Sequence, residues 1–81
     1  MPRLRRLSSG DVLRILHRFG FAVSGQRGSH AKLVRVSPGG ERQILIVPVH
    51  RDLATGTLHA IYRKAVRFVP SVELRRAFFA D

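Results

Sequence analysis

The sequence predicts an α+β fold with three antiparallel strands and two helices in the order α-β-β-β-α. Apolar residues recur with helical spacing near both ends of the chain, over residues 8–20 and from residue 57 onward. Between them, residues 21–47 consist of short β-like runs separated by glycine and proline. Because the chain has only 81 residues, we expect one domain spanning residues 1–81.

The first helix is predicted by the segment SSGDVLRILHRFGF. Ser8 or Ser9 can cap its N-terminus, and Asp11 falls in the first turn, where a negative charge suits the helix dipole. Gly20 is of the residue type that most often follows a helix end. One apolar stripe follows from the spacing of Val12, Ile15, Leu16 and Phe19.

The β-like runs in the middle of the chain predict three strands. They cover residues 21–24, 30–36 and 41–47. Ser37-Pro38-Gly39-Gly40 is a strong turn signal, so the second and third strands should form a hairpin. We expect Pro48 to end the third strand, because proline has no N–H to donate to a ladder.

A second helix is expected after a polar loop over residues 50–56, with Thr57 as its cap. Its apolar stripe comprises Leu58, Ile61, Tyr62 and Ala65. Pro70-Ser71-Val72-Glu73 indicates the start of a short C-terminal helix, which Leu74 and Phe78 would anchor. Packing the helices on one face of the sheet buries both stripes and leaves the other face open to water.

Alternation along the second strand decides which side chains reach that open face. His30 and Lys32 fall on one face, and Ala31 and Leu33 on the other. If Leu33 points at the helices, His30 and Lys32 share the open face. Two valines of the same strand would then share it as well, unless a bulge or twist intervenes, and the sequence leaves this open.

The net charge of the chain is strongly positive. Fifteen Lys and Arg residues against five Asp and Glu give 15 − 5 = +10, and thirteen of the fifteen are arginine. Guanidinium groups bind phosphate oxygens through paired hydrogen bonds, so we expect nucleic acid or an acidic protein as partner. A solvated basic surface without a ligand is the alternative.

Several classes of protein are not expected. The chain has no cysteine, which excludes a disulfide framework and a cysteine-bearing zinc site. The basic start MPRLRR leads into SSGD, not into the apolar segment of a secretory signal. No apolar run approaches the roughly 20 residues of a membrane span. We therefore expect a cytoplasmic protein without membrane contact.

Four histidines could carry chemistry, and their spacing speaks against a metal site. No HxH or HxxxH pair occurs, and no carboxylate pair accompanies the histidines. We expect His17 and His59 to be ordinary surface residues. His50, at the mouth of a loop, is either structural or in contact with a partner. His30 differs from these three because of its neighbours.

The neighbours of His30 suit the cleavage of RNA. Gly28 has no Cβ, so a phosphate or sugar can approach the backbone, and Ser29 adds a hydroxyl. Arg27 and Lys32 bracket the histidine with positive charge. An imidazole ordinarily titrates at about pH 6.5, so it can accept a proton from a ribose 2′-hydroxyl near neutral pH. The cations can stabilise the negative charge that grows on the phosphoryl oxygens. From these residues alone, an ordinary surface histidine remains the alternative.

Several separated pieces of the sequence also fit one known pattern. The pieces are the capped helix ending in Gly20-Phe21, Gly28-Ser29-His30, the Pro-Gly-Gly turn, Val47-Pro48-Val49-His50, and Gly56-Thr57-Leu58 followed by Ile61. In this order and spacing, over about residues 8–66, the chain resembles the HicA toxin family of bacterial type II toxin–antitoxin systems, also described as YcfA-like proteins.

The resemblance implies a fold similar to double-stranded RNA-binding domains and the activity of an mRNA interferase. Such a toxin is an endoribonuclease that cleaves messenger RNA without a metal or other cofactor. The family's catalytic histidine lies in its glycine-serine-histidine motif, which corresponds to His30 here. The implied partner is a HicB-type antitoxin, which blocks the toxin.

Our leading hypothesis is therefore a small ribonuclease toxin. His30 acts as general base, or as general acid to the leaving oxygen, while Arg27 and Lys32 contact phosphate and Gly28 and Ser29 shape the approach. A non-catalytic RNA-binding module with the same fold and charge is the second hypothesis. The third is an interaction protein whose basic face meets an acidic partner.

Overall fold

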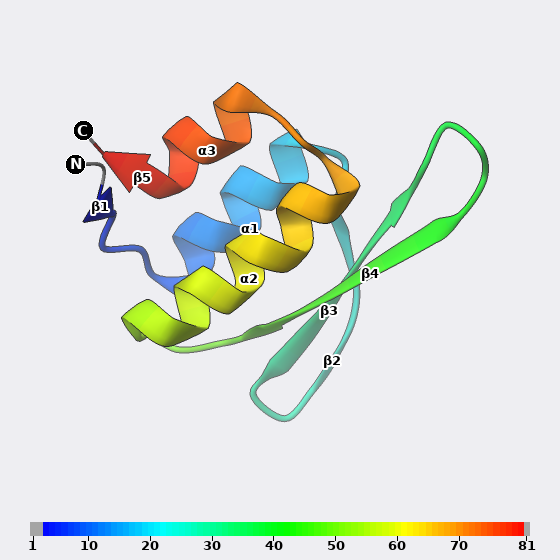
Figure 1. The fold of residues 1–81 in the computed structure, drawn as a ribbon. Coiled ribbons are helices and arrows are strands. Elements are labelled where there is room, and N and C mark those ends of the chain that lie inside the picture. Colours follow the sequence, from blue (N-terminus) through cyan, green and yellow to red (C-terminus); the bar gives the residue numbers. More distant parts are fainter. Residues whose placement is uncertain (1–2, 81) are drawn as a thin grey trace.

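A computed structural model of the protein describes residues 3–80 (Figure 1). In chain order its elements are β1 (Arg3–Leu4), α1 (Ser9–Arg18), β2 (Ala22–Arg27), β3 (His30–Val36), β4 (Arg42–Pro48), α2 (Thr55–Phe68), α3 (Val72–Phe78) and β5 (Phe79–Ala80). Strands β2, β3 and β4 form an antiparallel sheet in that order, and β1 pairs with β5. The helices gather on one side of the larger sheet (Figure 1), which confirms the predicted α+β class with its C-terminal helix.

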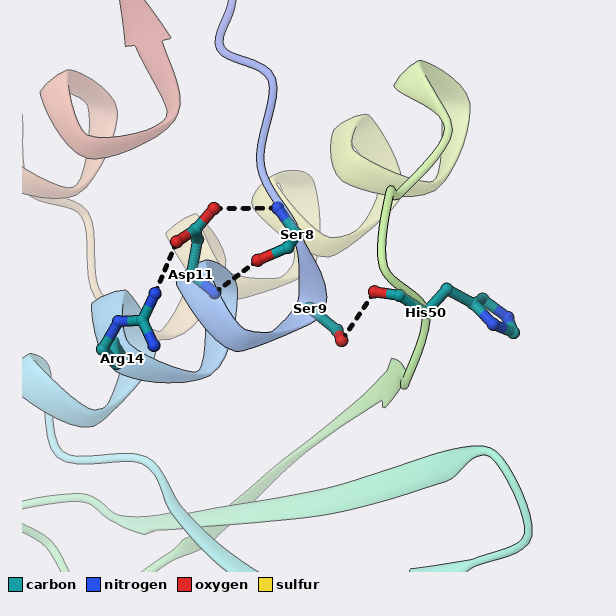
Figure 2. Close-up of polar contacts among 5 residues, drawn as sticks. All are labelled: Ser8, Ser9, Asp11, Arg14 and His50. Carbon is teal, nitrogen blue, oxygen red and sulfur yellow. Dashed lines mark hydrogen bonds and ion pairs between the residues drawn. The ribbon is translucent and has the colours of Figure 1, made fainter.

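Helix α1 begins with a reciprocal capping box (Figure 2). The Ser8 hydroxyl accepts a hydrogen bond from the Asp11 N–H at 3.1 Å, and the Asp11 carboxylate accepts one from the Ser8 N–H at 2.9 Å. These bonds from Ser8, backbone first, hold the pKa of Asp11 below its usual range, and the nearby Arg14 guanidinium acts in the same direction. Ser8, not Ser9, is therefore the cap of this helix.

The predicted apolar stripes meet in one core cluster. Helix α1 buries Val12, Ile15 and Leu16, and α2 buries Leu58, Ile61 and Ala65. The sheet contributes Ala31, Leu33, Leu45 and Val47. Phe19 and Tyr62 pack against this cluster while half-buried, and Leu74 and Phe78 of α3 are fully buried. Both helical periodicities and the two anchors of the C-terminal helix are thus confirmed.

Strand β2 is longer than the sequence predicted. It continues to Arg27, because its residues pair with β3 down to a two-residue turn, and the register shifts once between Val23 and Gly25. All six of its residues are exposed, so it has no continuous apolar run that would reveal its length. The bulge that the sequence left open for residues 30–36 does not occur, because β3 alternates without interruption, and the register shift lies in the neighbouring β2 instead.

Strand β4 ends at Pro48, as predicted, but the proline is the last residue of the strand and not the residue that follows it. Ala31 lies opposite Val47, and the Val49 N–H donates to the Ser29 carbonyl at 2.6 Å. In an antiparallel ladder hydrogen-bonded and non-hydrogen-bonded pairs alternate, so Pro48 occupies a non-hydrogen-bonded position. Its nitrogen faces the outer edge of the sheet, where the missing N–H breaks no ladder bond.

The expected cap of the second helix is wrong. Helix α2 begins at Thr55, and Ala54 occupies the N-cap without a side-chain hydrogen bond. The Leu58 N–H already donates to the Ala54 carbonyl at 2.9 Å, and the buried Leu53 donates its N–H to the Leu7 carbonyl at 3.3 Å. Tertiary contacts of the preceding loop thus fix the first helical turn before Thr57 is reached.

The two ends of the described chain are joined, which the sequence did not predict. Leu4 pairs with Phe79 between β1 and β5, and the Arg5 N–H donates to the Phe78 carbonyl at 2.8 Å. The ring of Phe79 packs edge-on against Tyr62 of α2, with centroids 5.0 Å apart. This clasp lies on the helical side of the molecule, away from the long hairpin strands (Figure 1).

Candidate functional site

Strand β3 divides its side chains between the core and solvent as expected. Ala31 and Leu33 are 1% and 0% exposed, whereas His30 and Lys32 are exposed. His30 and Lys32 therefore share the open face of the sheet. Further along the strand, Val34 is half-buried and Val36 is exposed on the same face, so two valines do accompany the polar pair.

A two-residue turn delivers His30 to the start of β3. Arg27 and His30 are paired, and between them Gly28 has φ +58° while Ser29 has a negative φ. This sign pattern is that of a type II′ hairpin turn, in which glycine is favoured at the first central position. A Cβ at Gly28 would meet no other described atom within 4 Å, so backbone conformation and not space is what favours glycine there. The turn thereby sets His30 directly opposite Arg27.

The open face carries a hollow of about 650 Å³ around His30. It is lined by Gly25, Gln26, Arg27, His30, Lys32 and Ile46. Of the five residues that the sequence singled out, the structure thus brings Arg27, His30 and Lys32 together. Gly28 and Ser29 form the adjoining turn and do not line the hollow.

The sequence did not single out Gly25, Gln26 and Ile46, which complete the hollow. Gly25 on β2 and Ile46 on β4 both lie opposite Lys32. Counting outward from the predicted turn at residues 37–40 places residue 45 opposite residue 32, whereas the structure pairs Val36 with Arg42 and so sets Ile46 there. The hairpin signal therefore predicts the strand pairing but does not identify Ile46. Gly25 depends on the bulge in β2, for which the sequence offers no signal.

The hollow is positively charged. Arg27 and Lys32 contribute cations, and its lining contains no carboxylate. Among residues 3–80 one ion pair is formed, between Arg14 and Asp11 on α1, so no described carboxylate neutralises Arg27 or Lys32. An open surface with unpaired cations attracts anionic ligands.

Arg35 shows that a cation on the same strand can serve the fold instead. Its Nε donates to the Phe19 carbonyl at the end of α1 at 2.9 Å, and its Nη1 donates to Gln43 at 2.7 Å. Its position in the β3 alternation places it on the face of Leu33, away from His30. Arg35 therefore caps a helix end and does not contribute to the hollow.

The other three histidines do not line the His30 hollow. The His50 carbonyl accepts two hydrogen bonds from the buried Ser9, from its N–H at 3.1 Å and its hydroxyl at 2.8 Å. Figure 2 shows the imidazole of His50 pointing away from that contact, and the residue is exposed. His17 and His59 are exposed as expected, and His59 lies edge-on to Phe79 at 5.9 Å.

Two further properties constrain the chemistry of the described part of the chain. Among its residues, no three His, Cys, Asp or Glu side chains gather closely enough to hold a metal ion. No helix within it is both long and apolar enough to cross a membrane.

The fold and the site define a small, strongly basic α+β protein with an exposed imidazole in an open cationic hollow. Residues 9–66 match the family model described as the HicA toxin of bacterial toxin-antitoxin systems, and the chain belongs to this family. The match begins at α1, includes the whole three-stranded sheet and ends near the end of α2. No curated protein matches the chain significantly. Membership makes the protein the toxin of a toxin–antitoxin system and implies an antitoxin as its partner.

Proposed function

We propose that this toxin is a metal-independent endoribonuclease that cleaves messenger RNA at the His30 hollow. The observation that carries the proposal is the placement of one exposed imidazole between Arg27 and Lys32, in a hollow whose lining contains no carboxylate. A phosphodiester can enter such a site without charge repulsion, and the imidazole is free to exchange protons with it.

In the proposed reaction, His30 accepts the proton of a ribose 2′-hydroxyl as general base. The 2′-oxygen then attacks the adjacent phosphorus, so the O2′–P bond forms and the P–O5′ bond breaks. The products are a 2′,3′-cyclic phosphate and a free 5′-hydroxyl. Arg27 and Lys32 stabilise the negative charge that grows on the phosphoryl oxygens.

The leaving 5′-oxygen needs a proton, and one imidazole cannot accept and donate a proton in the same step. Water and the exposed imidazole of His50 are the two proton sources that we consider. Val49 donates a hydrogen bond to Ser29 and so extends the ladder beyond Pro48, and His50 is the next residue along the chain. In the reverse assignment, protonated His30 donates to the 5′-oxygen and water accepts the 2′-proton.

The antitoxin is proposed to be a HicB-type protein with an acidic surface that covers the hollow. The toxin's net charge of +10 favours an acidic partner, and covering the hollow would exclude RNA from His30. Since messenger RNA is the substrate, the proposed place of action is the cytoplasm.

The test is cleavage of a 5′-labelled RNA by the purified toxin in the presence of a chelator. We expect products ending in a 2′,3′-cyclic phosphate, and a loss of roughly 10²- to 10⁴-fold in rate for His30→Ala. His17→Ala is the matched control, because it removes another exposed imidazole, on α1. Both variants should keep the melting temperature of the parent.

Two results would contradict the proposal. A His30→Ala protein that still cleaves RNA and arrests growth at the parental level would remove the imidazole from the mechanism. RNA that stays intact but binds the parent protein in a salt-sensitive manner would favour a non-catalytic RNA-binding module.

A further inference from the structure

The His30 hollow is the first of three neighbouring hollows that share lining residues, and we call the three together the depression. It shares Ile46 with a second hollow of about 230 Å³ between β4 and α2. That second hollow shares Ala60 and Lys64 with a third, of about 590 Å³, on the outer side of α2. Three adjoining hollows therefore connect His30 to Arg67.

The cations along this depression lie mainly at its two ends, and Lys64 also borders the second hollow. Arg27 and Lys32 lie at one end, and a basic strip on α2, formed by Arg63, Lys64 and Arg67, lies at the other. All three cations of the basic strip are exposed, and none forms an ion pair with a described carboxylate. The carboxylates at positions 11, 41, 52 and 73 line none of the three hollows.

The middle of the depression is apolar. Ile46, which is 47% exposed, stands on the open face opposite Lys32, and Pro48 and Ala60 continue the apolar lining toward α2. A large exposed aliphatic side chain between two groups of cations can contact a flat apolar group, such as a base, while the cations bind the negatively charged backbone that carries this group.

We infer that the basic strip of α2 binds the single-stranded RNA that continues from the bond cleaved at His30. This inference rests on the proposed nuclease function, because His30 marks where the strand is cut. Phosphates would lie on the cations at both ends, and an unstacked base would lie on Ile46. Double-stranded RNA keeps its bases stacked inside the helix, so it has no base to place on that side chain.

The dimensions require a strand of several nucleotides. Adjacent strands are about 4.8 Å apart, and the seven residue steps from Ala60 to Arg67 advance about 10 Å along α2. A dinucleoside monophosphate bound at His30 would therefore not reach Arg67 at the far end of the basic strip, whereas a longer oligonucleotide would.

The first test measures binding without cleavage, in the His30→Ala protein, with a fluorescent 12-nucleotide single-stranded RNA. We expect Lys64→Gln with Arg67→Gln to weaken binding at least tenfold. The slope of the logarithm of the binding constant against the logarithm of the salt concentration should become about 1.4 less steep, because each phosphate contact to a single strand contributes ~0.7 to that slope. Arg42→Gln with Arg76→Gln is the control, because it removes the same charge. Arg67 and Arg76 each lie in the last turn of a helix, and Arg42 lies on β4 outside the three hollows. The control pair should change the dissociation constant less than threefold.

The second test measures kcat/KM with His30 intact, on the 12-nucleotide RNA and on a dinucleoside monophosphate. For the Lys64/Arg67 double variant we expect at least a tenfold loss on the longer substrate and a clearly smaller loss on the dinucleoside. Equal losses on both substrates would mean that α2 acts on the cleavage step or on folding, and would overturn the inference.

Other outcomes separate this inference from the proposed function. If the parent protein does not cleave RNA, the proposed function fails, and the binding test still reports on α2. Equal weakening by both variant pairs, or no RNA binding by the His30→Ala protein, would overturn the inference. The same follows if the Lys64/Arg67 variant binds RNA normally but no longer captures its antitoxin, because the basic strip would then be part of the antitoxin interface.

Discussion

Along β3, residues 31 and 33 face the helices and are almost completely buried, whereas residues 30 and 32 face solvent. Ala31 and Leu33 belong to the apolar cluster that holds the sheet to α1 and α2. His30 and Lys32 make no hydrogen bond through their side chains to the described residues, and they line the open hollow. Alternation along this one strand thus separates the side chains that pack in the core from those that line the hollow, and we expect each face to tolerate changes that leave the other intact.

The largest effect is expected on the buried face. Leu33→Ala removes a fully buried side chain, and we expect a loss of about 2–5 kcal/mol in the free energy of unfolding. Denaturant titration would measure it. Lys32→Ala, on the opposite face of the same strand, is the control, and a comparable loss there would show that the two faces are not independent.

The turn that precedes β3 should respond at an intermediate level. Gly28 has φ +58°, which an alanine adopts only at a cost of roughly 1–2 kcal/mol. We expect Gly28→Ala to lower stability by about that amount and also to lower RNA cleavage, because the turn positions His30. Gly25→Ala is the comparison, since Gly25 has no positive φ and no nearby described atom to meet a Cβ. An unchanged stability of Gly28→Ala would contradict the turn assignment.

On the open face, Lys32→Gln should affect binding and not folding. Surface substitutions usually change stability by no more than about 0.5 kcal/mol, so the melting temperature should stay near that of the parent. Loss of one phosphate contact should weaken RNA binding several-fold. It should also make the slope of the logarithm of the binding constant against the logarithm of the salt concentration about 0.7 less steep. Binding titrations at several salt concentrations would measure both, and an unaltered salt dependence would place Lys32 outside the RNA contact.

The smallest expected effect is on the acid stability of the protein, to which Asp11 in the capping box of α1 contributes. Hydrogen bonds from Ser8 lower the pKa of Asp11 from its ordinary value of 3.8. The carboxylate therefore contributes stability above that value, and the contribution is lost as the pH falls through the lowered pKa. Asp11→Asn should flatten the decline of the melting temperature in acid and leave RNA cleavage at neutral pH unchanged. An acid decline as steep as the parent's would contradict this role.

Much of the fold follows from local patterns in the sequence. Helical spacing identified the buried stripes of α1 and α2, and the Pro-Gly-Gly turn identified β3 and β4 as a hairpin. Period-2 alternation was enough to place His30 and Lys32 on a common face. These features depend on neighbouring residues only, and one sequence records them completely.

Features that join distant segments were missed or predicted incorrectly. The pairing of β1 with β5 unites the two ends of the described chain, and two-residue strands are too short to leave a pattern. Pro48 stays in β4 because its nitrogen faces the outer edge, and α2 begins at Thr55 because Leu53 is held by the backbone of Leu7. Each depends on which partner a backbone group faces, and local sequence does not contain that information.

The sequence by itself determined the class of fold, the excess of positive charge and the histidine on which the proposed chemistry rests. Tertiary structure alone decided which cations remain available to a ligand. Arg35 is used on a helix end, whereas Arg27, Lys32 and the basic strip of α2 have no described carboxylate partner. The reason is physical: a charge is neutralised or exposed according to what packs beside it, and packing arises from contacts between residues far apart in the chain.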